Sequence, residues 1–150
     1  MGRVGFACVF FLLLGVLFVT ASPSAPPADA VARLKHTEPL LDVLHTLRPS
    51  FLSGDFDTDG RADVVLHVRD HVTGKVGIAI EHSSTHEWFV AGAGHRMGSG
   101  DDDFDWMDSW RVVKNTVTNK GDAVCTEKSE AASGLVYWTG HDYRWFQQGD

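Results

Sequence analysis

Most of this chain after residue 60 consists of short strand-like segments, joined in several places by links of only a few residues. Six such segments are ADVVLHV (62–68), VGIAIEH (76–82), EWFVAG (87–92), DAVCTEK (122–128), GLVYW (134–138) and YRWFQQ (143–148). A period of two residues is typical of a β-strand, and links such as RDHVTGK and SSTH join antiparallel neighbours. The pattern therefore predicts an antiparallel sheet of about six strands.

One short helix is expected before this sheet. Apolar residues fall at helical spacing in PLLDVLHTL, at Leu40, Leu41, Val43, Leu44 and Leu47. Pro49 ends the pattern, because proline lacks the amide hydrogen that a helix needs. The expected fold class is α+β, with a short N-terminal helix followed by the antiparallel sheet.

The last two strand-like segments are joined by TGHD, which favours a tight turn. A two-residue loop at 140–141 would place Trp138 opposite Tyr143 on one aromatic face, which we expect to lie in the core. The opposite face would carry Leu135, Tyr137, Arg144 and Phe146. Arg144 should then lie at the sheet edge or pair with an acidic side chain.

The first residues have the order of a secretory signal peptide: Arg3, an apolar run over 4–19, and small residues around Ala21. We therefore expect cleavage after residue 21, a flexible proline- and alanine-rich linker over 22–38, and a single domain over 39–150. An uncleaved membrane anchor is the alternative, although the apolar run is slightly short for a bilayer. The mature protein is expected to be secreted or periplasmic, with no membrane association.

The composition is acidic, with 13 Lys and Arg against 20 Asp and Glu and a formal net charge of -7. This balance argues against nucleic acid as a partner, because the phosphate backbone is bound by basic surfaces. Only Cys125 remains once the leader is removed, so we expect no intrachain disulfide. The position of Cys125 in a strand-like segment predicts a buried thiol.

Four aspartates crowd into GDFDTDGRADVVL, at Asp55, Asp57, Asp59 and Asp63. Alternate carboxylates in a tight loop can converge on one cation, and Gly60 permits the sharp turn that this requires. The backbone carbonyl of Arg61 would supply a further oxygen. Without a cation these carboxylates would repel one another. Oxygen ligands in a flexible loop favour calcium over zinc or magnesium.

The same stretch resembles the calcium loops of FG-GAP repeats, which occur in integrin-type propellers and in many secreted bacterial proteins. Such loops typically read GDFDGDGKxDLVV, and the resemblance includes Gly54, Phe56 and the apolar residues that follow the last aspartate. It implies side-chain ligation by Asp55, Asp57, Asp59 and Asp63, and carbonyl ligation by Arg61. A full propeller is excluded, because it needs several blades and this chain is too short for them.

A second acidic run, SGDDDFDWMD, places Asp101, Asp103 and Asp105 at the same alternate spacing, but Trp106 replaces the glycine. It is open to three interpretations: a degenerate second metal site, additional ligands for the first site, or a solvated loop. We expect the stretch 95–115 to be a long loop with a helical turn at 107–110. Trp106 and Trp110 are the best candidates for exposed aromatic side chains that bind a partner, because this loop is otherwise polar.

These observations favour an exported calcium-binding protein that is a non-catalytic binding or structural module, with a protein or glycan as a further partner. A second hypothesis is a small secreted metal-dependent hydrolase, in which His82 or His86 acts as acid or base. Such an enzyme requires a histidine within reach of the ion and an open coordination position. A third hypothesis is an inhibitor or carbohydrate-binding module that uses the loop 106–110.

Overall fold

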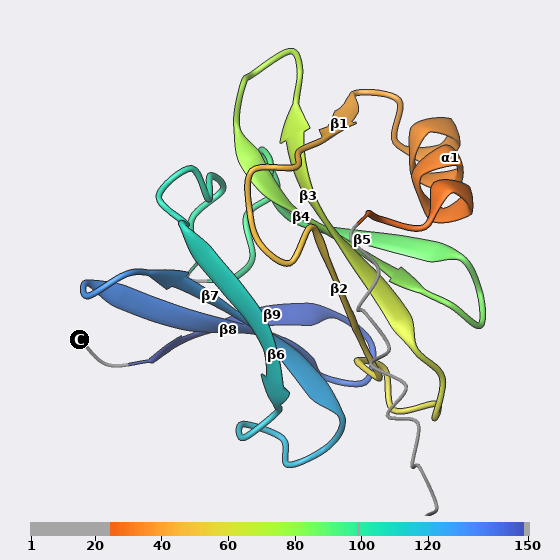
Figure 1. Cartoon of the computed structure of the whole chain (residues 1–150). Helices are drawn as coiled ribbons and strands as arrows, with labels where there is room; N and C mark the ends of the chain where they lie inside the picture. The colour runs from red at the N-terminus through yellow and green to blue at the C-terminus, as the bar shows by residue number, and fades with distance from the viewer. Residues whose placement is uncertain (1–24, 99, 149–150) are drawn as a thin grey trace, which may run out of the picture.

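The computed structural model describes residues 25–98 and 100–148, and the expected signal peptide lies outside these ranges. The described chain forms one helix and two antiparallel sheets with nine strands in total, so the fold is mostly β (Figure 1). The elements are α1 (Ala28–Thr37), β1 (Leu41–Val43), β2 (Phe51–Gly54), β3 (Asp63–Asp70), β4 (Val76–His82), β5 (Glu87–Gly92), β6 (Ser109–Lys114), β7 (Asp122–Lys128), β8 (Ala132–Trp138) and β9 (Tyr143–Gln148). The first sheet has the order β1-β3-β4-β5 with β2 also paired to β3, and the second has the order β6-β7-β8-β9.

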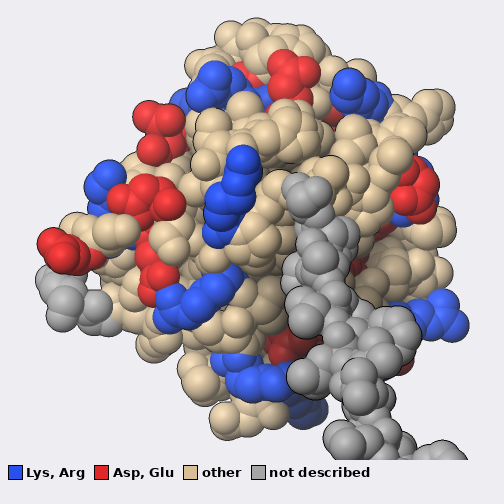
Figure 2. Space-filling view, viewed as in Figure 1, with Lys and Arg blue, Asp and Glu red and all other residues tan. Residues whose placement is uncertain are grey.

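The elements form three layers, with the first sheet between α1 and the second sheet (Figure 1). Neighbouring residues of β3 belong to different cores: Val65 packs with the second sheet, whereas Leu66 packs with α1. All seven residues of β4 are buried, because both faces of this strand are covered. Acidic and basic side chains are interspersed on the face shown in Figure 2, which carries no continuous basic surface.

The six strand-like segments are confirmed as β3, β4, β5, β7, β8 and β9. In the last hairpin, Trp138 lies opposite Tyr143 as expected, and Arg144 on edge strand β9 pairs with Asp142 at 3.3 Å. The prediction of a single sheet was wrong, because β3, β4 and β5 lie in one sheet and β7, β8 and β9 in another. The strands β1, β2 and β6 were missed. The first two have only three and four residues, too few to show a period. β6 occupies part of the expected long loop and replaces the end of the helical turn predicted at 107–110.

The predicted position of the helix was also wrong. Residues 40–47 form β1 and irregular chain, and the helix lies instead in the segment assigned to the linker. Leu41 pairs with Asp70 of β3, so strand pairing overrides the helical spacing of the leucines. α1 is rich in alanine and buries Ala30 and Leu34, which lie one turn apart. Within the described ranges, no helix is long and apolar enough to cross a membrane.

One ion pair attaches α1 to the first sheet. The guanidinium of Arg33 donates to both carboxylate oxygens of Glu81, from Nε at 2.5 Å and from NH2 at 2.9 Å. Glu81 is 1% exposed, so its charge depends on this partner. Asp29, one turn earlier in α1, accepts a further bond from Arg33 at 2.9 Å. The hydrogen bonds to Glu81 and Asp29 hold the pKa of Arg33 above its usual value.

His67 is a buried histidine in β3. It is 4% exposed, and its ring centroid lies 5.9 Å from that of Trp110. Its Nδ1 lies 3.3 Å from Thr46 Oγ1, whereas Nε2 is buried without a hydrogen-bond partner in the described chain. Burial disfavours the imidazolium and lowers the pKa of His67 from 6.5 to about 4.

We expect the fold to lose stability as the pH falls from 6.5 towards 4. In this window the unfolded chain takes up a proton at His67 that the folded state does not, so acid favours unfolding. The difference between the two pKa values corresponds to a loss of about 3 kcal/mol in the free energy of unfolding. Urea unfolding of the wild type and of His67→Leu at a series of pH values measures this loss, because the variant lacks the proton uptake. A difference in unfolding free energy that is constant across the window would contradict the expectation.

Candidate metal centre

The loop 55–62 connects β2 to β3 and contains three of the four aspartates of the motif; Asp63 begins β3. At the base of the loop, Gly54 pairs with Asp63. The amide of Asp55 donates to Asp122 Oδ2 at 3.0 Å, and the amide of Asp122 donates to the Asp55 carbonyl at 2.8 Å. Because Asp122 begins β7, these two bonds hold the loop against the second sheet.

The backbone of this loop turns around its own carboxylates. Thr58 and Gly60 have positive φ angles of 68° and 83°. A Cβ atom at Gly60 would meet nothing within 4 Å, so the backbone conformation, and not space, favours glycine there. The amide of Gly60 donates to Asp55 Oδ2 at 3.2 Å, and the amide of Asp59 donates to Asp57 Oδ1 at 3.1 Å.

Asp55, Asp57 and Asp59 form a candidate metal site. Each offers one carboxylate oxygen, and these three oxygens lie within 4.8 Å of one another. The Oδ1 atom of Asp55 is buried, and the described residues provide no hydrogen-bond partner for it. A buried acceptor without a partner costs free energy, and so does the mutual repulsion of three carboxylates. A cation at this position would remove both costs.

Asp63 differs from the other three aspartates because it is fully buried. Its Oδ2 accepts a hydrogen bond from the amide of Phe56 at 3.0 Å, and its Oδ1 accepts one from the amide of Ser83 at 2.8 Å. Burial raises the pKa of Asp63, while these two amides act in the opposite direction. Asp63 therefore joins the aspartate loop to the turn after β4, a role that the motif alone does not reveal.

A second group of side chains that could hold a metal consists of Asp57, Asp63 and His82. His82 is 4% exposed; its Nε2 lies 2.8 Å from the Tyr143 hydroxyl and its Nδ1 lies 3.5 Å from Asp57 Oδ2. Burial and the nearby carboxylates raise the pKa of Tyr143, so the phenol stays protonated. Because Nε2 is engaged by this hydroxyl, Nδ1 is the ring nitrogen of His82 that faces Asp57.

Arg61 is exposed, and its amide donates to Asp59 Oδ1 at 2.8 Å. This bond lowers the pKa of Asp59, which favours the ionised carboxylate that a cation requires. Ligation by the Arg61 carbonyl stays a prediction.

The second acidic run is not part of either group of candidate ligands found in the described ranges. The Oδ1 atom of Asp101 accepts a hydrogen bond from the amide of Asp102 at 2.7 Å. The Oδ1 atom of Asp103 accepts bonds from the amides of Val76 and Asp105, both at 3.0 Å. These carboxylates stabilise the loop and attach it to β4, and metal binding by this run stays a prediction.

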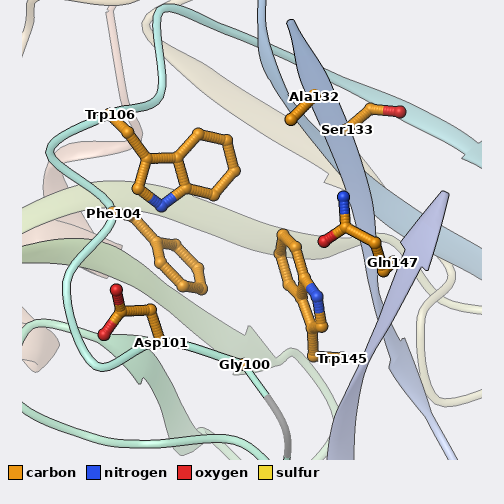
Figure 3. Close-up of a pocket in the computed structure, with 8 residues that line it drawn as sticks. All are labelled: Gly100, Asp101, Phe104, Trp106, Ala132, Ser133, Trp145 and Gln147. Atoms are coloured by element: carbon orange, nitrogen blue, oxygen red, sulfur yellow. The ribbon is translucent and has the colours of Figure 1, made fainter. Parts of the chain in front are cut away.

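The two tryptophans expected to be exposed differ in the structure. Trp110 is buried at 2% exposure, and its Nε1 donates to the Pro49 carbonyl at 2.8 Å. The expectation was wrong for Trp110 because this residue lies in β6 and faces the core between the sheets. Trp106 is partly buried and lines a cleft together with Phe104 and Trp145 (Figure 3). The sequence did not predict that Trp145 lines this cleft, because the alternating pattern of its strand assigns Trp145 to the core.

Two further side chains bear on the enzymatic hypothesis. His86 is exposed, and its Nδ1 lies 3.1 Å from Glu81 Oε1, in the ion pair that attaches α1. Cys125 is fully buried as expected, and burial raises the pKa of its thiol to about 11. A thiol that stays protonated at neutral pH is a poor nucleophile.

The sequence matches no family model, and no curated protein or solved structure matches this chain. The likeness to FG-GAP loops therefore rests on the residues of the motif. The geometry establishes an acidic cluster at the β2–β3 loop that could hold a metal ion.

Proposed function

We propose that this chain is an exported calcium-binding protein, in which the FG-GAP-like loop between β2 and β3 holds one calcium ion and the protein acts as a non-catalytic binding or structural module. The observation that carries the proposal is the convergence of Asp55, Asp57 and Asp59, together with a buried Asp55 Oδ1 that has no hydrogen-bond partner among the described residues. Calcium takes about six to eight oxygen ligands from flexible loops, whereas zinc prefers nitrogen and sulfur. The resemblance supports the same three ligands and adds Asp63 and the Arg61 carbonyl.

The bound ion would stabilise the contact between the two sheets. The loop is attached to β7 through Asp122 and to the end of β4 through Asp63. The carboxylate of Asp122 also pairs with Lys114 Nζ at 2.5 Å, so its charge is already compensated within the second sheet. Calcium would cancel the repulsion among the loop carboxylates and make this connection rigid.

We expect calcium to raise the melting temperature and a chelator to lower it. A ligand that binds only the folded state, present at a hundredfold its dissociation constant, stabilises the fold by about 2.7 kcal/mol. Asp57→Asn should abolish most of this shift, and in chelator it should be at least as stable as the wild type, because one repelling charge is gone. Thermal melts of both proteins in calcium and in chelator measure these effects.

The control for this experiment is Asp42→Asn, an exposed aspartate outside both acidic runs that should keep the full calcium response. Equal melting temperatures of the wild type in calcium and in chelator would refute the proposal. A larger shift with zinc than with calcium, lost in His82→Asn, would assign the metal to the Asp57, Asp63 and His82 group instead.

A further inference from the structure

A cleft of about 310 Å³ lies between the segment 100–106 and the strands β8 and β9. Its lining residues are Gly100, Asp101, Phe104, Trp106, Ala132, Ser133, Trp145 and Gln147 (Figure 3). A volume of this size is at the lower end of small-molecule sites, which are mostly apolar with a few polar groups.

Three aromatic rings form the walls of this cleft. The ring centroid of Phe104 lies 5.8 Å from that of Trp106 and 5.6 Å from that of Trp145, and the two indole centroids lie 5.9 Å apart. The ring planes are inclined to one another by 49° to 85°, so the rings form a corner and not a flat platform. A corner of this kind presents π-electron density from several directions to one compact group.

The position of Trp145 is fixed by two glycines. A Cβ atom at Gly134 would come within 2.0 Å of the indole Cζ2, and one at Gly100 would come within 3.0 Å of the Trp145 Cβ. The indole therefore lies directly on the backbone of β8, where a larger residue than glycine would displace it. Phe104, at 1% exposure, is equally well held. The side chains of Trp145 and Phe104 are therefore held in place before any ligand binds, which lowers the entropic cost of binding.

The charge of the cleft has one sign. Among the described lining residues Asp101 is the only one with a charged side chain, and it is exposed. The chain as a whole is also acidic, with a formal net charge of -7. An anionic ligand would be repelled, whereas a cation would be attracted both by Asp101 and by the ring faces.

We propose that this cleft binds a small molecule through a quaternary ammonium group. Methylated ammonium groups are compact, carry a diffuse positive charge and favour the faces of several aromatic rings at once. Trp106 and Trp145 are partly exposed and supply the faces, the buried Phe104 supports both indoles from behind, and Asp101 supplies the opposite charge. The rest of the ligand would extend towards Ser133 and Gln147, which offer hydrogen-bonding groups at the other side of the cleft.

The test compares choline with 3,3-dimethyl-1-butanol, a neutral molecule of the same shape, by calorimetry on the wild-type protein. We expect choline to bind at least tenfold more tightly than the alcohol, because only choline carries the charge. Trp106→Leu should weaken choline binding about tenfold, and Asp101→Asn by several-fold. Asp105→Asn, an exposed aspartate of the same loop that does not line the cleft, should bind choline as the wild type does.

Equal affinity for choline and the neutral alcohol, or no choline binding at 100 mM, would overturn the proposal. Binding of neutral monosaccharides in preference to choline would also overturn it and would assign the cleft to carbohydrate. Melting temperatures of Trp106→Leu and Asp101→Asn show whether each variant is folded. If Trp106→Leu does not fold, the conservative Asp101→Asn still tests the proposal. The choline titrations are repeated in chelator. A failure of the choline proposal can then be distinguished from a failure of the calcium proposal.

Discussion

Asp63→Ala should lower the free energy of unfolding by about 4 kcal/mol, in chelator as well as in calcium. The reason is that the buried carboxylate accepts hydrogen bonds from the amides of Phe56 and Ser83. Alanine would leave the buried amide of Phe56 and the partly buried amide of Ser83 without an acceptor, and a buried amide of this kind costs about 1 to 3 kcal/mol. Urea unfolding in chelator isolates this structural contribution from any bound ion.

Two variants accompany this measurement. Asp63→Asn keeps one acceptor oxygen but turns an amide group towards the other N–H, so it should be intermediate in stability. Asp59→Ala is the matched control, because Asp59 is exposed and its carboxylate accepts from the amide of Arg61 and interacts with the exposed Ser84, so no buried group loses a partner. In chelator it should cost less than about 1 kcal/mol. Equal stabilities of Asp63→Ala and Asp59→Ala in chelator would show that Asp63 lacks this structural role.

The strands that the sequence predicts are those with a clear apolar pattern. β6 has six residues, as β5 and β9 do, but it follows the aspartate- and glycine-rich stretch that was assigned to a loop. β4 and β7 each have seven residues, and their apolar patterns are evident in VGIAIEH and DAVCTEK. β1 and β2 are too short to have a pattern of their own, and each exists because β3 provides a partner. The division into two sheets is likewise a tertiary property, because it depends on which strands hydrogen-bond to one another, and β5 and β7 do not.

The candidate metal site was predictable in part because its aspartates are neighbours in the sequence. The spacing of Asp55, Asp57 and Asp59 is enough to bring their carboxylates together around a glycine turn. The contact of His82 with Tyr143 joins residues 61 positions apart, and no local pattern reveals it. The aromatic cleft has the same origin, since Trp106 and Trp145 lie far apart in the sequence and are brought together by the fold.

The position of α1 has a consequence for the start of the folded domain. Residues 28–37 belong to the segment predicted as a flexible linker, yet Ala30 and Leu34 are fully buried against the first sheet. A chain that begins at residue 39 would uncover the apolar face formed by Leu66, Val68 and Ala79. The helix is therefore part of the folded unit, and the ion pair of Arg33 with Glu81 is its main polar attachment.

Arg33→Ala should cost about 4 kcal/mol of unfolding free energy, because it leaves the Glu81 carboxylate buried without its guanidinium partner. The exposed partner of the same arginine provides the control: Asp29→Ala removes a bond at the surface and should cost less than about 1 kcal/mol. Adding Glu81→Leu to Arg33→Ala removes the buried charge, which would otherwise be left with the exposed His86 at 3.1 Å as its neighbour, and should restore much of the loss. Urea unfolding of the three variants at neutral pH measures these differences. Equal stabilities of Arg33→Ala and Asp29→Ala would show that apolar packing alone holds α1 in place.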